Sequence, residues 1–251
     1  MSRIDDYRKT LTSLDAWEPF LLRESGLPGP RGNLELAAAV AELGSAGQFA
    51  RWLTLSPEEA PVNSPQEFLV FCAVRGQGRL LAEGQSDSLA ILRRFASDPR
   101  WRTREAVAMA LQRWGDDDMD GLLAAMADWS CGTFLEQRAA AAALCEPRLL
   151  VDARHAGTVQ EILDAITFTI LSVDDRRDPD FRVLRQALGY CWSVSVAALP
   201  ESGKAIMERW CGSDDSDVRW IMRENLRKKR LQKMDDSWTA QQRHALHGDD
   251  S

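Results

Sequence analysis

Apolar residues recur along most of this chain with the spacing of an α-helix. Leu89, Leu92 and Phe95 fall on one helical face. A second face holds Val107, Ala110, Leu111 and Trp114. No Asn-Gly or Asp-Gly turn has the alternating flanks of a β-hairpin, and the apolar run from Ile166 to Val173 continues a helical segment. The pattern therefore predicts an all-α protein.

Helix-start signals divide this pattern into elements. Before residue 84 we expect helices over 3–23, 34–44, 46–54 and 65–83, the second capped by Asn33. Ser56-Pro57 and Ser64-Pro65 both begin capping boxes, in which a Glu follows the Ser by three residues. The loop 25–33 contains too many Gly and Pro residues to be helical.

Three further caps are expected later in the chain. Thr158, with Glu161 three residues on, predicts a helix that runs through Leu171. Asp98-Pro99 and Asp178-Pro179 each place Asp at the cap and Pro at the first helical position.

A short phrase recurs after these starts: an acid-rich turn, an arginine, and then a helix rich in Ala and Leu. Its arginines are Arg104, Arg138, Arg182 and Arg219, which lie 34, 44 and 37 residues apart. A period in this range indicates stacked helical pairs, each too small to bury its own apolar face. We therefore expect a right-handed α-α superhelix, a helical-repeat solenoid.

The phrase is absent from the first part of the chain, which gives the expected domain organisation. Residues 1–85 would form a helical cap region, residues 86–231 the repeats, and residues 232–251 a polar, frayed tail.

Composition narrows the classes of function. The net charge of −7 does not favour phosphate backbones or anionic lipids in general. No apolar run reaches the ~18–20 residues that cross a bilayer, and the N-terminus does not resemble a secretory signal. The five cysteines are scattered, which predicts buried free thiols. We expect a cytoplasmic protein with no membrane partner.

The recurring arginines and aspartates have two interpretations. In stacked helices, an Arg of one unit bonds an Asp or a carbonyl of its neighbour, which makes a structural ladder. The alternative is a row of arginines that faces an anionic ligand. The sequence favours the ladder, formed by Asp98, Arg104, Arg138, Asp178, Arg182 and Asp217.

A basic cluster near the C-terminus is the main candidate for binding. We expect it to lie on one helix, where its arginines recur at i+3 and i+4 and so share one face. The candidate residues are Arg219, Trp220, Arg223, Arg227, Lys228 and Arg230. A site for phosphate or an acidic peptide is one interpretation, and a solvated last helix is the other.

Nine tryptophans against two tyrosines is an unusual ratio. Helical spacing favours core packing for most of them, with the indole N–H bonded at the rim of the core. An exposed subset would instead stack on a base or grip a peptide.

Known catalytic and metal-binding patterns are missing from the sequence. The Gly-rich loop 26–32 has no Lys-Ser/Thr after it, and no zinc, EF-hand or nucleophile-elbow pattern occurs. We therefore assign no catalytic residue, no metal site and no cofactor.

The phrase resembles the HEAT-repeat family, whose pattern is an acidic-Pro turn, Val-Arg, and then Ala and Leu in a second helix. The segments Asp178 to Gly189 and Asp217 to Leu226 carry the resemblance, which extends over residues 86–231. Trp101 to Ala106 and Ser213 to Leu231 are also similar to the DNA alkylation repair glycosylases built on the same solenoid. That resemblance implies a basic cradle with an aspartate and tryptophans at the lesion. No local motif fixes which residues would match.

Two functions follow as expectations. The first is a non-enzymatic binding module that holds a protein or peptide in its concave groove. The second is a DNA-binding or alkylated-base excision protein, favoured by the basic cluster and the surplus of tryptophan.

Overall fold

The computed structural model of the protein describes residues 2–248, and its regular elements are helices throughout. In that range it contains 15 α-helices and one short 3-10 helix, and no strand. The expectation of an all-α protein is confirmed.

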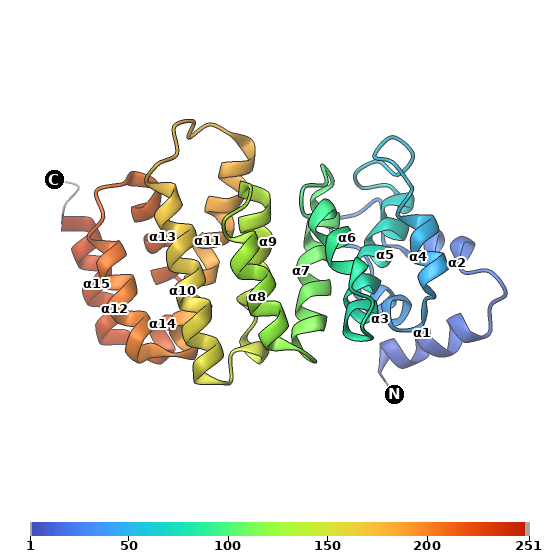
Figure 1. Ribbon diagram of the computed structural model, residues 1–251, viewed down its shortest axis with the longest axis horizontal. Helices are drawn as coiled ribbons and strands as arrows, with labels where there is room; N and C mark the ends of the chain where they lie inside the picture. Colours follow the sequence, from blue (N-terminus) through green and yellow to red (C-terminus); the bar gives the residue numbers. More distant parts are fainter. Residues whose placement is uncertain (1, 249–251) are drawn as a thin grey trace. The chain divides into compact units, whose positions relative to one another are not determined.

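The contacts between helices divide the chain into two compact units. Unit 1 ends at Asp117 and unit 2 begins at Asp118. Unit 1 contains α1 (Arg3–Thr12), α2 (Glu18–Glu24), α3 (Leu34–Leu43), α4 (Ala46–Trp52), α5 (Pro65–Ala82), α6 (Asp87–Ala96) and α7 (Trp101–Gly115) (Figure 1). Unit 2 contains α8 (Met119–Trp129), α9 (Phe134–Leu144), η1 (Pro147–Leu149), α10 (Ala153–Ile170), α11 (Pro179–Ala198), α12 (Pro200–Cys211), α13 (Ser216–Leu226), α14 (Lys229–Met234) and α15 (Asp236–Gly248). The expected start of the repeats, at residue 86, lies inside unit 1.

Helix α5 is the centre of unit 1. It is buried on every side from Phe68 to Val74, and α2, α3, α4, α6 and α7 pack around it. A helix that is apolar all round must be covered all round. The tightest approach is at Gly78, where an added Cβ would lie 2.1 Å from the carbonyl oxygen of Ala110 in α7.

Helix α11 has the same role in unit 2. It packs against α9, α10, α12, α13 and α14, and its Phe181, Leu184, Leu188 and Trp192 are all buried. Around it, consecutive helices pair, as α8 does with α9 and α12 with α13 (Figure 1). Alternate helices pack side by side in the orders α8, α10, α12 and α9, α11, α13. This is the arrangement expected of stacked helical pairs.

Several predicted helix starts are confirmed. Asn33 caps α3 and Ser64 caps α5, each through its side-chain oxygen, and Pro65 is the first residue of α5. Asp178 caps α11 by accepting from the N–H groups of Asp180 and Phe181. These caps could be recognised because all their partners lie within three residues.

Other boundaries differ from the prediction. The expected helix over 3–23 is broken between Thr12 and Glu18, because Pro19 begins a new helix in its first turn. Helix α10 starts at Ala153 rather than at Thr158, since Asp152 caps it first. Ser56 and Glu59 form the hydrogen bonds of a capping box on a turn that does not continue as a helix.

The expected frayed tail over 232–251 is also corrected. Helices α14 and α15 occupy most of it, and Trp238, Thr239 and Leu246 are buried. The hydrophobic contacts of these three side chains hold a segment whose composition is otherwise polar. Residues 249–251 of the predicted tail lie outside the described residues.

Most tryptophans are in the core, as expected. Trp129 and Trp192 are fully buried, and Trp210 and Trp238 are nearly so. Their indole N–H groups find partners where the core meets polar side chains: that of Trp210 donates to Asp164 at 2.7 Å, and that of Trp238 to Glu208 at 2.6 Å. Trp17 and Trp220 are half-buried, and Trp101 is the most exposed, with 46% of its surface accessible.

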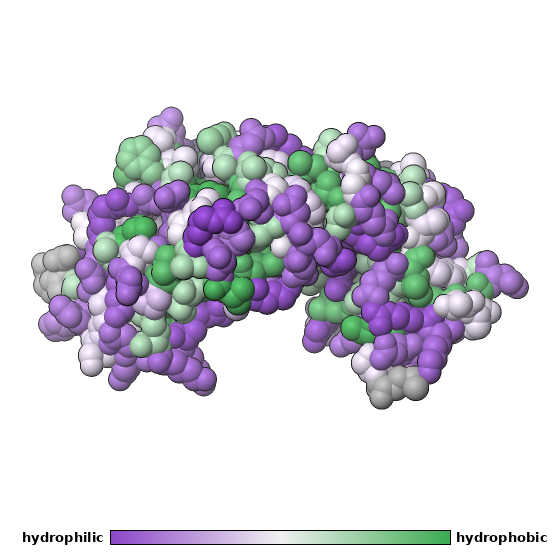
Figure 2. Space-filling view, turned by 60° about the horizontal axis from the view of Figure 1, so that its bottom comes forward, coloured by the Kyte–Doolittle hydropathy of each residue, from purple (hydrophilic) through white to green (hydrophobic). Residues whose placement is uncertain are grey.

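The surface of the described residues is mixed. Hydrophilic residues cover most of the face drawn in Figure 2, and hydrophobic residues are exposed on it in separate patches. No described helix combines the length and the apolar character needed to cross a membrane. The described residues also contain no group of three or more His, Cys, Asp or Glu side chains placed to hold a metal ion.

The close approach of α5 and α7 makes a stability prediction. We expect Gly78→Ala to lower the free energy of unfolding by about 2 kcal/mol, because the new methyl group meets rigid backbone of α7. Gly47→Ala is the matched control, since a Cβ added there on the exposed side of α4 has nothing within 4 Å. It should raise the free energy of unfolding by roughly 0.5 kcal/mol. Urea denaturation measures both. Equal effects of the two substitutions would contradict the close packing.

Thiol reactivity gives a second prediction. Cys131 is exposed, whereas Cys72, Cys145, Cys191 and Cys211 are buried. Burial raises the pKa of the Cys72 and Cys145 thiols, and raises that of Cys211 to about 12. A disulfide reagent at neutral pH should therefore modify one thiol rapidly and the others only on unfolding. The Cys131→Ser variant should lose the rapid phase, and a rapid phase that survived it would refute the assignment.

Candidate functional site

The predicted basic cluster does not lie on a single helix. Helix α13 ends at Leu226, Arg227 and Lys228 form a turn, and α14 starts at Lys229. The turn brings α14 back against α11, where Leu231 is buried. The expectation of one continuous basic face is therefore wrong.

The arginines of α13 and of the turn after it differ in their surroundings. The guanidinium of Arg219 donates to the carbonyl of Leu246 in α15 at 2.8 Å, so this side chain is used within the fold. Arg223 follows it one turn later and is half-buried. Arg227 is exposed and pairs with Glu224 at 2.5 Å.

Another stripe of α13 faces α11 and forms an open groove. Trp220 and Glu224 of α13, four residues apart, line one side of it together with Lys228 of the turn that follows. The other side comes from Arg182, Arg185, Gln186, Gly189 and Tyr190 of α11. We call this site the α11/α13 groove. It brings together three of the predicted residues, Arg182, Trp220 and Lys228.

The aromatic rings of the groove lie against cations. The guanidinium carbon of Arg185 is 3.8 Å from the centre of the Trp220 ring, and Arg185 also pairs with Asp217 at 2.6 Å. Arg230 donates to the Tyr190 hydroxyl, and Lys228 lies 6.0 Å from the Tyr190 ring. The ring contacts hold positive charge at the groove wall, and the charge of Arg185 is paired with that of Asp217.

Two further features shape the groove. Gly189 allows Trp220 to pack closely on α11, because an added Cβ would lie 3.1 Å from the indole ring. The side chain of Arg182 is exposed, and its guanidinium forms no hydrogen bond or ion pair with any described residue. The groove therefore combines an unpaired cation with partly exposed aromatic faces, which suits an anionic segment with apolar groups.

The recurring arginines occupy matching positions but have different partners. Arg104, Arg182 and Arg219 are each the fourth residue of their helix, and Arg138 is the fifth of α9. Arg104 donates to the carbonyls of Asp98 and Pro99 in the turn before its own helix, at 2.7 and 3.2 Å.

The aspartates of the predicted ladder are bonded by other arginines or by their own helix. Asp217 accepts from Arg176 at 3.1 Å as well as from Arg185. Asp178 caps α11, whereas Asp98 does not cap α7 as predicted. Both oxygens of Asp98 are bonded to buried Arg100, at 2.8 and 2.7 Å. Helix α7 therefore begins at Trp101 and not at Pro99.

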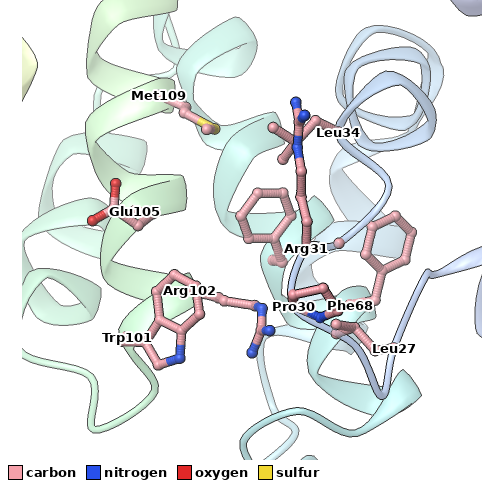
Figure 3. A pocket seen from close by; sticks show the side chains of 11 residues that line it. Leu27, Pro30, Arg31, Leu34, Phe68, Trp101, Arg102, Glu105 and Met109 are labelled. Carbon is pink, nitrogen blue, oxygen red and sulfur yellow. The ribbon is translucent and has the colours of Figure 1, made fainter.

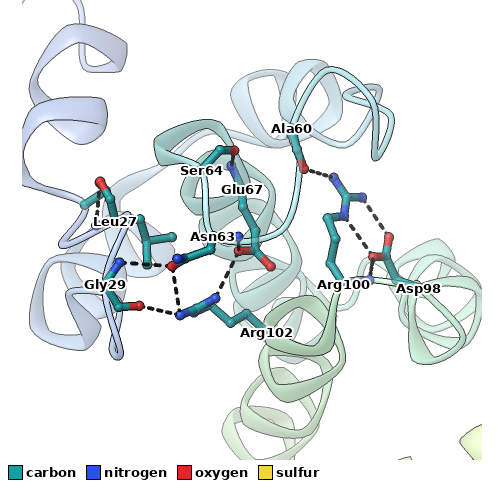
Figure 4. Close-up of polar contacts among 10 residues, drawn as sticks. Leu27, Gly29, Ala60, Asn63, Ser64, Glu67, Asp98, Arg100 and Arg102 are labelled. Carbon is teal, nitrogen blue, oxygen red and sulfur yellow. Dashed lines mark hydrogen bonds and ion pairs between the residues drawn. The ribbon is translucent and has the colours of Figure 1, made fainter.

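A second polar centre, in unit 1, was not anticipated from the sequence. Buried Arg102 donates to the Gly29 carbonyl at 2.7 Å, to Asn63 at 3.2 Å and to Glu67 at 3.3 Å (Figure 4). Asn63 in turn accepts from the Gly29 N–H at 3.0 Å. These bonds join the loop 25–33 to the starts of α5 and α7. Residues 29, 63, 67 and 102 are far apart in sequence, so no local pattern revealed them.

Arg102 and Glu67 make a third prediction. Arg102→Met should lower the free energy of unfolding by about 3 kcal/mol, because it leaves the fully buried Glu67 carboxylate without its cation. Adding Glu67→Gln should recover part of the loss, since it removes the orphaned charge. Arg94→Met, at an exposed position, is the control and should change the free energy of unfolding by less than about 0.5 kcal/mol. Urea denaturation of the three variants is the measurement. A loss no larger than that of the control would rule out the buried ion pair.

Comparisons with known proteins give no family for this chain. No family model matches it, and no curated protein matches it. A solved crystal structure, described as that of an engineered protein, aligns with 93% of this chain and 98% of its own, at 16% sequence identity and a TM-score of 0.38.

Proposed function

We propose that this chain is a non-enzymatic, HEAT-like helical-repeat module that binds an acidic segment of a protein partner. The helical pairs of unit 2 would form part of a right-handed solenoid, with the α11/α13 groove as the contact surface. The observation that carries the proposal is the exposed, unpaired Arg182 beside the partly covered rings of Trp220 and Tyr190.

The chemistry of the groove supports a peptide as the partner. Arg and Trp are enriched among the side chains that contribute most to binding in protein interfaces. Arg182 and Lys228 would pair with carboxylates of the partner, and Trp220 would contact its apolar groups. Glu224 also lines the groove and already pairs with Arg227. It would discriminate against an unbroken row of negative charges.

Duplex DNA is the alternative partner, favoured by the cations of the same groove. A DNA cradle needs many phosphate contacts along a basic surface, and its affinity falls steeply with salt. The groove contributes Arg182, Arg185 and Lys228, and Arg185 already pairs with Asp217. These contacts favour a short acidic segment over a long polyanion.

Charge reversal in the groove tests the proposal. We expect a labelled peptide of alternating Glu and Leu to bind the protein. Arg182→Glu combined with Lys228→Glu should weaken its binding at least about tenfold, because two attractive contacts become repulsive. The control is Arg177→Glu with Lys233→Glu, which makes the same charge change at exposed positions outside the groove. Fluorescence anisotropy is the measurement.

Two outcomes would refute the peptide assignment. One is equal weakening by the groove variant and the control. The other is tight, strongly salt-dependent binding of a labelled DNA duplex by a protein that does not bind the peptide, which would establish the alternative.

A further inference from the structure

Unit 1 contains a small pocket separate from the α11/α13 groove. It lies between α7, α5 and the loop 25–33, and Figure 3 shows Trp101, Glu105 and Met109 of α7 on one side and Leu34 on the other. Its apolar walls come from Leu27, Leu34, Phe68, Phe71 and Met109. The volume is about 140 Å³. Apolar cavities of roughly 150 Å³ in proteins accept benzene, so the pocket has room for one aromatic ring.

Trp101 marks the rim of this pocket as a contact surface. It is 46% exposed, unlike the buried Trp114 of the same helix. The guanidinium of Arg102 lies 4.4 Å from the centre of its ring and so holds the indole in place. A fixed, exposed indole beside an apolar pocket is suited to covering a bound ring.

The pocket is held open by the polar centre behind it. Arg102 bonds Gly29, Asn63 and Glu67, which fixes the loop against α5 and α7 (Figure 4). A pocket that is already formed loses little conformational entropy when a ligand enters.

The groups that are available around the pocket are hydrogen-bond donors. Nε of Arg102 is buried and has no acceptor among the described residues, although the rest of its guanidinium is bonded. Arg31, on the rim, is exposed and forms no hydrogen bond or ion pair with them. Glu105 also lines the pocket and already interacts with another residue. A buried donor without an acceptor is unfavourable, and an anionic ligand would satisfy it.

We propose that this pocket binds a small aromatic carboxylate. The ring lies between Phe68, Phe71 and the indole of Trp101, and the carboxylate accepts from Arg31 and from Nε of Arg102. This is a second site, in the other unit from the peptide groove. A negative binding result at one site therefore does not contradict the proposal for the other.

Calorimetric titration with three matched probes tests the ligand class. The probes are 3-phenylpropanoate, its neutral amide 3-phenylpropanamide and the cation phenethylamine. We expect the carboxylate to bind at least about tenfold more tightly than the amide, because a charge-assisted hydrogen bond exceeds a neutral one. No heat of binding from the carboxylate, equal affinity of acid and amide, or tightest binding of the amine through Glu105 would each overturn the proposal.

Three variants test the location. Arg31→Gln should remove most of the preference for the acid over the amide, while Arg94→Gln, at an exposed position outside the pocket, should keep it. Met109→Trp, which fills the pocket from a half-buried position, should weaken all the probes that bind. Unchanged binding in both Arg31→Gln and Met109→Trp, with thermal unfolding like that of the parent protein, would place the ligand elsewhere.

Discussion

The complete burial of one stretch of helix in each unit is the constraint on which the rest of the structure depends. Phe68 to Val74 of α5 in unit 1 and Cys191 to Val196 of α11 in unit 2 are buried on all sides, so neither stretch is stable until several other helices cover it. Among the covering helices, α6 is amphipathic and buries one face, with Leu92 and Phe95. Each unit is therefore built outward from a central helix.

Polar side chains complete this arrangement by bonding backbone groups of the neighbouring helix. Arg79 of α5 donates to the carbonyls of Ala41 and Gly44 at 2.9 and 2.5 Å, and so binds the C-terminal end of α3. Asn225 of α13 donates to the carbonyl of Leu188 and accepts from the N–H of Ser193, both in α11, at 2.7 and 2.8 Å. Because unpaired backbone groups are costly inside a protein, such bonds fix how each helix is placed on the central one. The arginines that do this are not those of the recurring phrase.

Features that depend on residues close together in the sequence were predicted well. The class of the fold, the caps at Asn33, Ser64 and Asp178, and the core faces of α6 and α7 all follow from residues a few positions apart. The prediction failed where a neighbouring side chain is held in place by groups far away in the sequence. Local pattern made Asp98 a cap, but Arg100 takes both of its oxygens while also bonding the carbonyls of Leu55 and Ala60, at 3.2 and 3.4 Å.

The candidate sites also depend on contacts between residues far apart in the sequence. The sequence picked out Trp220 and Lys228 because they are local to a basic segment, but only folding could bring Arg185 and Tyr190 against them. Nothing in the sequence near Trp101 separates it from the buried tryptophans. Trp101 lines its pocket together with the loop 25–33, about seventy residues earlier in the chain.

Arg176 ties the turn before α11 to the first turn of α13. It bonds Asp215, the cap of α13, at 2.8 Å and Asp217 at 3.1 Å, and it lies 5.6 Å from the ring of Phe181. Unfolding of the start of α13 therefore breaks contacts that also hold the start of α11. A molecule bound against Trp220 would consequently stabilise both helices through thermodynamic linkage. The α11/α13 groove and the core of unit 2 would then unfold in one cooperative transition.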